Sequence, residues 1–161
     1  MSTLFHRRYL ACPYDRARYI LAETLQDLAE SGRPVVQRLR VQFPSADGDG
    51  ASVEKDVIVT YGVGNDPLHF DQPWAVHWMP ANGGPFPEFD GTLTVRADED
   101  YTTCALELRG NYEPPLGIPG ALFDTVLGSR IASATAREFL KEIGTRIETR
   151  YRAEEAAKAS R

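Results

Sequence analysis

The chain has 161 residues, a length that fits one domain and allows a core that buries about 68–70% of the unfolded surface. Hydrophobic residues make up 42% and charged residues 25%, so intrinsic disorder is not expected. The net charge of −5 argues against a nucleic-acid partner, because duplex binding depends largely on cations that neutralise phosphates. No apolar run approaches the ~20 residues that span a bilayer. No apolar run follows the basic N-terminal residues either. We therefore expect a cytoplasmic protein without a signal peptide or membrane span.

The first two elements expected along the chain are a strand over residues 3–11 and a helix that begins near Pro13. Asp15 falls in the first turn of that helix, where a negative charge is favourable. The helix should end at Gly32, because Pro34 cannot continue it. Its apolar stripe has spacings of three and four and consists of Tyr14, Ala17, Leu21, Leu25 and Leu28.

Five segments of alternating apolar and polar residues follow. Such alternation is typical of antiparallel strands that have one packed face and one wet face. We therefore predict a single antiparallel sheet over residues 35–112. His77 and Glu107 fall on its wet parity. The five segments lie at residues 35–43, 56–63, 74–79, 89–96 and 103–109.

A long helix is expected after an irregular bridge that starts at Glu113, and it should run to about Tyr151. A long apolar stripe needs a large apolar partner, and the packed face of the sheet is the candidate. The stripe consists of Phe123, Leu127, Ile131, Phe139, Ile143 and Ile147. We predict one domain over residues 1–151 and a frayed or disordered tail over residues 152–161, because the stripe is lost there.

The segment from Leu106 to Gly117, followed by Gly120 and Asp124, resembles the last strand and helix entry of bacterial SRPBCC proteins. This superfamily includes the START domains, the birch-pollen allergen group and the polyketide cyclases. The segment from Trp78 to Ala81 is similar to the same group, and the resemblance extends over residues 55–147. It implies an α+β helix-grip fold, in which a curved antiparallel sheet of about six strands wraps around the long C-terminal helix. It also implies a cavity between sheet and helix for a small hydrophobic molecule, and it transfers no catalytic residue.

The inward parity of the strands and the final helix would form the wall of that cavity. These side chains are hydrophobic and aromatic, as in most small-molecule pockets. The alternative is that they fill a solid core. Among the inward positions of the central strands, the side chain that comes nearest to a candidate acid or base is Lys55, near a strand end. No general acid or base is therefore expected in the cavity. The predicted ligand-binding residues are Val59, Tyr61, Trp74, Trp78, Leu93, Leu106, Leu108, Tyr112, Phe123, Leu127 and Ile131.

Neither a metal site nor a cofactor site is predicted. His6, His69 and His77 have no ligand spacing, and Cys12 and Cys104 form no Cys-x-x-Cys motif. Both thiols are expected to stay reduced and unbridged, as is usual in the cytosol.

Three hypotheses of function follow, and the first is a non-catalytic binder or carrier of a small hydrophobic molecule. The second is an enzyme of the polyketide cyclase or dehydratase type, which a buried ionisable pair would favour. The third is a protein-interaction module without a ligand, which a sealed core and an exposed apolar patch would favour.

Overall fold

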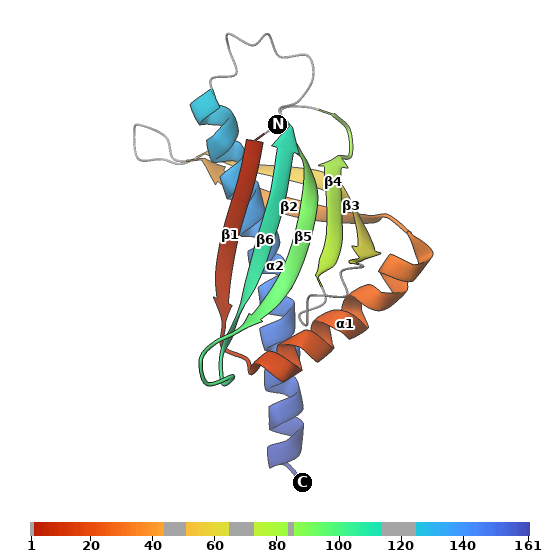
Figure 1. Ribbon diagram of the computed structural model, residues 1–161, viewed down its shortest axis with the longest axis vertical. Coiled ribbons are helices and arrows are strands. Elements are labelled where there is room, and N and C mark those ends of the chain that lie inside the picture. The colour runs from red at the N-terminus through yellow and green to blue at the C-terminus, as the bar shows by residue number, and fades with distance from the viewer. Residues whose placement is uncertain (1, 44–50, 65–72, 84–85, 114–124) are drawn as a thin grey trace.

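The structure of the protein is a computed structural model that describes residues 2–43, 51–64, 73–83, 86–113 and 125–161. Six strands and two helices follow one another in the order expected from the sequence (Figure 1). The elements are β1 (Ser2–Leu10), α1 (Tyr14–Ser31), β2 (Val35–Phe43), β3 (Ala51–Val63), β4 (Trp74–Pro80), β5 (Glu88–Ala97), β6 (Cys104–Glu113) and α2 (Thr125–Ala159).

The limits of α1 come from its flanking residues. Pro13 precedes the first turn with an extended backbone (φ −60°, ψ 147°), and Gly32 closes the helix in the left-handed conformation at φ 60°. Glycine adopts that conformation without a steric penalty, and a proline just before the helix gives up no helical hydrogen bond, because its position needs no N–H donor. Both expected ends of this helix are confirmed.

The six strands form one sheet in the order β1-β6-β5-β4-β3-β2, and every neighbouring pair is antiparallel. The sheet curls, so that its two edge strands, β1 and β2, both lie against α2, and α1 packs against α2 and the inner face of the sheet (Figure 1). This arrangement is the predicted helix-grip fold.

The centre of the core lies where α2 meets the middle of the sheet. Trp78 of β4 is directly opposite Phe89 of β5, and their rings stack with centroids 4.3 Å apart. Phe139 of α2 lies on the indole of Trp78, with a centroid distance of 5.1 Å. All three side chains are buried, so this aromatic cluster joins the helix to the sheet.

Two opposed glycines make room for this cluster. Gly91 and Gly110 are cross-strand partners on β5 and β6. A Cβ atom on either would lie 2.6–2.7 Å from Cζ of Phe89 and 2.2–2.3 Å from a carbonyl oxygen of the facing strand. The ring of Phe89 therefore occupies space that any other pair of residues would fill.

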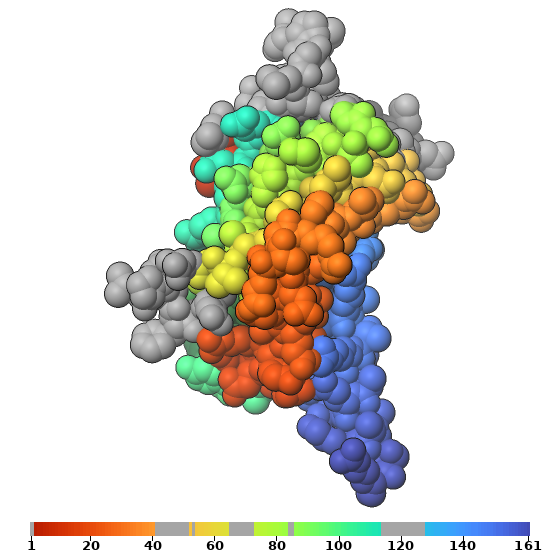
Figure 2. Space-filling view, turned by 90° about the vertical axis from the view of Figure 1, so that its right-hand side faces the viewer, coloured from red at the N-terminus to blue at the C-terminus, as the bar shows by residue number. Residues whose placement is uncertain are grey.

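The C-terminal segment corrects one expectation. α2 was expected to end near Tyr151, with residues 152–161 frayed or disordered, but the helix continues to Ala159. This end of α2 projects beyond the body of the molecule (Figure 2). Alanine, glutamate and lysine are strong helix formers, and Lys158 forms an ion pair at 2.9 Å with Glu155. Local propensity thus extends the helix where the apolar stripe has ended.

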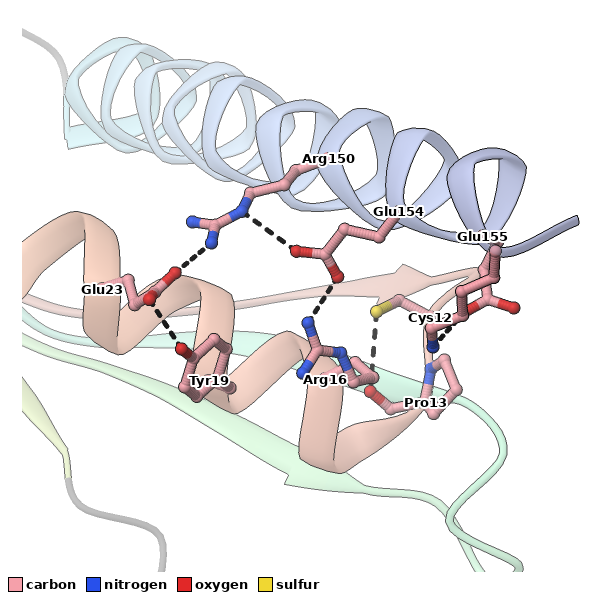
Figure 3. A network of polar contacts seen from close by, with 9 residues as sticks. Cys12, Pro13, Arg16, Tyr19, Glu23, Arg150, Glu154 and Glu155 are labelled. Atoms are coloured by element: carbon pink, nitrogen blue, oxygen red, sulfur yellow. Dashed lines mark hydrogen bonds and ion pairs between the residues drawn. The ribbon is translucent and has the colours of Figure 1, made fainter. Parts of the chain in front are cut away.

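An ion-pair network joins α1 to α2 (Figure 3). Arg16 donates to Glu154, and Arg150 donates to both Glu23 and Glu154. Tyr19 donates to Glu23 at 2.7 Å. The pKa of Glu23 is lowered by its hydrogen bonds from Tyr19 and Arg150, and that of Glu154 chiefly by its hydrogen bond from Arg16.

We expect Phe139→Ala to destabilise the protein by about 3–5 kcal/mol, because a fully buried ring would be lost from the aromatic cluster. Urea unfolding measures this, and Arg152→Ala on the exposed part of α2 is the matched control, with an expected loss below about 0.5 kcal/mol. A small loss for Phe139→Ala would show that α2 does not pack on the sheet in this way. The side chain of Leu127, for which the sequence predicts the same role, lies outside the described part of the chain.

We expect the network between α1 and α2 to weaken in acid. A carboxylate whose folded pKa is lowered contributes stability above its unfolded pKa, ordinarily 4.5, and loses that contribution as the pH falls through the folded value. In urea melts from pH 7 to pH 3, the free energy of unfolding should therefore fall less steeply with decreasing pH in the double variant Glu23→Gln/Glu154→Gln than in the wild type. Glu99→Gln, at an exposed turn, is the control. An equally steep fall in the double variant and the wild type would refute this contribution.

Candidate functional site

The predicted ligand-binding residues separate into a sealed group and a group at the margins of the core. Val59, Leu93, Leu106 and Leu108 have no exposed surface and Trp78 has 1%. Tyr61, Trp74, Tyr112 and Ile131 keep 5–7%. Phe123 and the side chain of Leu127 lie outside the described residues. The structure thus brings nine of the predicted residues, those of the two groups, to the inner side of the sheet, as expected.

The sealed group shows how the middle of the inner face is filled. A side chain without accessible surface cannot border a space large enough for water. Leu93 and Leu108 are direct cross-strand partners, and Leu106 faces Val95 in the next row. At these positions the inner face is therefore a packed core. This agrees with the alternative in which these side chains fill a solid core rather than line a cavity.

A hollow borders the inner face at Trp74. It has a volume of about 260 Å³ and lies between α1 and the sheet. Its floor is apolar and its rim carries one acidic, one basic and one phenolic side chain. The lining residues are Trp74 and Val95 from the sheet, and Asp15, Arg18, Tyr19, Leu21 and Ala22 from α1.

Polar side chains on the inner face of β1 were not identified from the sequence. Leu4 and Leu10 are buried, so His6 and Arg8 share their inward parity, while Phe5 and Tyr9 are exposed on the outer face. Both parities of this strand contain apolar residues, so alternation alone does not distinguish them. The register does: His6 faces the buried Leu108, and Arg8 faces the buried Leu106.

Hydrogen-bond donors dominate the polar groups of this interior. Gln37 Nε2 and Trp78 Nε1 are buried and have no hydrogen-bond partner among the described residues. Burial raises the pKa of Tyr61 to about 12, so its hydroxyl remains protonated. No Asp or Glu occupies an inner-face position in the described parts of the strands. The inner face of the described strands therefore carries hydrogen-bond donors and the imidazole of His6, but no carboxylate.

The outer face of the sheet requires a correction at Glu107. It lies on the outer face as expected, but it is buried rather than wet, with 7% exposure. Arg7 Nε donates to it at 2.9 Å and Arg96 Nε at 3.4 Å. The guanidinium groups of Arg7 on β1 and Arg96 on β5 cover the carboxylate of Glu107. These two ion pairs are therefore a structural feature of the sheet. His77 lies on the outer face, opposite Asp90.

The two cysteines are free, buried and close to each other. Cys104 Sγ donates to the carbonyl oxygen of Cys12 at 3.2 Å. Burial raises the pKa of Cys12 to about 11 and that of Cys104 to about 12. Neither thiol is activated as a nucleophile, since the thiolate is the reactive form.

Neither a metal cluster nor a membrane-spanning helix occurs within the described ranges. Their His, Cys, Asp and Glu residues form no group of three or more that could hold a metal ion. Neither α1 nor the described length of α2 is long and apolar enough to cross a bilayer.

Comparison with known proteins gives similarity of fold only. No protein-family model matches the chain, and no curated protein matches it. Solved structures similar to it include a START superfamily protein from Mycobacterium smegmatis, with 13% identity, a TM-score of 0.48 and coverage of 91% of this chain and 97% of that one. A protein from Thermus thermophilus has 16% identity, a TM-score of 0.46 and coverage of 91% and 97%. An uncharacterized protein from Bacillus thuringiensis has 15% identity, a TM-score of 0.44 and coverage of 88% and 98%.

The first of these structures bears the superfamily name that the sequence resemblance suggested. Every TM-score is below 0.5 and every identity is below 25%. The assignment of the helix-grip fold therefore depends on the strand order and helix placement of this chain itself, and the function has to be argued from its own residues.

We expect both thiols to be free but slow to react in the native protein, because each is buried and its pKa is raised. Titration with a thiol reagent in denaturant, without reductant, should find two reactive groups. Cys104→Ser should leave one. Detection of none in the denatured wild type would mean that the two cysteines are bridged.

Proposed function

We propose that the protein binds or carries a small, mainly hydrophobic molecule, and that the hollow at Trp74 is where the molecule is held. The supporting observation is the composition of this hollow. Trp74 and Val95 of the sheet and Leu21 of α1 provide an apolar floor, while Asp15 and Arg18 stand at the rim. Ligand sites commonly combine an apolar lining with a few polar groups that orient the ligand.

The size of the hollow favours a compact ligand. Its volume of about 260 Å³ is just below the range of about 300–1,000 Å³ that is usual for ligand pockets. Trp74 faces Leu93 across β4 and β5, and Leu93 faces Leu108. We propose that these packed residues, with Val59, Trp78 and Leu106, form the wall behind the ligand, and that Tyr61 lies beside the opening.

The remaining predicted residues belong to the opposite end of the inner face. Tyr112 of β6 is the cross-strand partner of Phe89, which in turn is the partner of Trp78. Ile131 lies in the first part of α2. With Phe123 and Leu127 they remain proposed contacts for a ligand larger than the Trp74 hollow can hold. A single domain over residues 1–151 and a cytoplasmic location are likewise proposals, the latter supported by the two free thiols.

Binding is favoured over catalysis because of what the inner face contains. The hydroxyl of Tyr61 can donate a hydrogen bond, but no carboxylate in the described strands points inward with it. Turnover of a polyketide would require an acid or base placed against the substrate, and His6 on the inner face of β1 is not among the residues that line the Trp74 hollow. A polyketide cyclase or dehydratase and an interaction module without a ligand are retained as the two alternatives.

We expect a compact apolar ligand to raise the melting temperature, because a molecule that binds only the native state stabilises it by mass action. Single-tryptophan variants locate the site. In Trp78→Phe the indole of Trp74 is retained and its emission should change on binding, whereas in Trp74→Phe the emission of the packed Trp78 should not.

Trp74→Ala should weaken binding by about tenfold or more, because it removes most of the apolar floor. Tyr9→Ala, which truncates an exposed aromatic residue on the outer face, is the control and should leave binding unchanged. A screen of apolar fluorophores and aromatic acids that moves neither the melting temperature nor the emission would reject the carrier function. A response from Trp78 alone would place the ligand in the core instead.

A further inference from the structure

A second hollow lies between α2 and the edge strand β2. Its volume is about 230 Å³. Arg40 of β2 lines it, together with Ala134, Arg137, Glu138 and Lys141 of α2. Three cations and one carboxylate leave an excess of two positive charges here, in a chain whose net charge is −5. The local charge is thus opposite in sign to that of the whole molecule.

The carboxylates near this hollow neutralise its cations only in part. Arg40 donates from Nε at 3.0 Å and from Nη2 at 2.6 Å to the same oxygen of Glu54, and its other terminal nitrogen has no hydrogen-bond partner among the described residues. Lys141 Nζ is 3.9 Å from Glu138, at the limit of an ion pair. Arg137 has no carboxylate partner among the described residues. Even with Glu54 counted, the excess charge stays positive.

The helix itself places two of these cations together. Arg137 and Lys141 are four residues apart on α2, so their side chains share one face, and like charges at this spacing repel each other. His6 of β1, which is close enough to Arg137 to be affected by its charge, adds little further positive charge. Its pKa is lowered by burial and by Arg137, so it is mainly neutral near pH 7. A bound anion would relieve this repulsion.

We propose that the hollow between β2 and α2 binds a phosphate group through Arg40, Arg137 and Lys141. Guanidinium groups offer paired donors that fit the oxygens of phosphate, and the ammonium group of lysine adds a point charge. A phosphate carries one to two negative charges and three acceptor oxygens, so it can offset the excess charge and accept hydrogen bonds from more than one of these side chains. The phosphate belongs either to a free small molecule or to a lipid headgroup. This site is separate from the Trp74 hollow and does not depend on the proposed carrier function.

Inorganic phosphate and lipid vesicles test the two sources with the full chain. Phosphate at millimolar concentration should raise the melting temperature above that in sodium chloride of equal ionic strength. Arg137→Gln and Lys141→Gln should each weaken phosphate binding about tenfold, since each removes a charged donor. Arg137→Lys keeps the charge and should retain part of the affinity. The matched control is Arg152→Gln, which removes one exposed charge from the same helix outside the hollow and should have no effect.

Co-flotation with vesicles of phosphatidylcholine, with and without phosphatidic acid, completes the experiment. Binding of both free phosphate and phosphatidic acid vesicles, lost in Arg137→Gln and Lys141→Gln, supports the site. Binding of vesicles alone with the same dependence supports it and assigns the source to a headgroup. Equal losses in Arg152→Gln would indicate unspecific attraction and overturn the proposal, as would the absence of binding in both arms. Urea melts of each variant confirm that these exposed substitutions leave the fold intact.

Discussion

The contact between Phe139 of α2 and the stacked pair of Trp78 and Phe89 is the interaction on which the rest of the structure depends. A curled sheet has two free edges and one concave apolar face. In water the edges leave backbone groups without a strand partner, and the face leaves apolar side chains uncovered. α2 covers the concave face with the ring of Phe139 and lies between the edge strands β1 and β2. The opposed Gly91 and Gly110 are part of the same solution, because only they leave room for Phe89.

The position of α2 also decides where open space remains. The aromatic cluster and the leucines around it fill the middle of the inner face, so the two hollows proposed as sites lie away from it. One is at Trp74, where α1 crosses the end of the sheet, and the other is at Arg40, where α2 passes the edge of β2. The first has an apolar floor and the second is lined by cations. The two therefore suit ligands of different chemistry, one mainly hydrophobic and one anionic.

Charged groups in this molecule serve different purposes in different places. Glu107 lies under Arg7 and Arg96 on the outer face, and the network of Arg16, Arg150 and Glu154 fastens α1 to α2. In both cases opposite charges are paired, which is the usual state of ion pairs in a folded protein. The hollow at Arg137 departs from this pattern, because its cations outnumber the carboxylates within reach. That difference separates a structural network from a candidate binding site.

Sequence periodicity by itself determined the order of the elements, the limits of α1 at Pro13 and Gly32, and the inward parity of β3 to β6. These features follow from local rules, namely which residues begin or end a helix and which alternate along a strand. Only the tertiary structure decided the parity of β1, because Phe5 and Tyr9 make its outer face as apolar as its inner one. It also decided that the predicted cavity wall is packed around Leu93 and Leu108, and that Arg40 and Arg137 line the same hollow. Whether a space is filled, or two distant charges meet, depends on how closely the elements approach one another, and no local pattern encodes that distance.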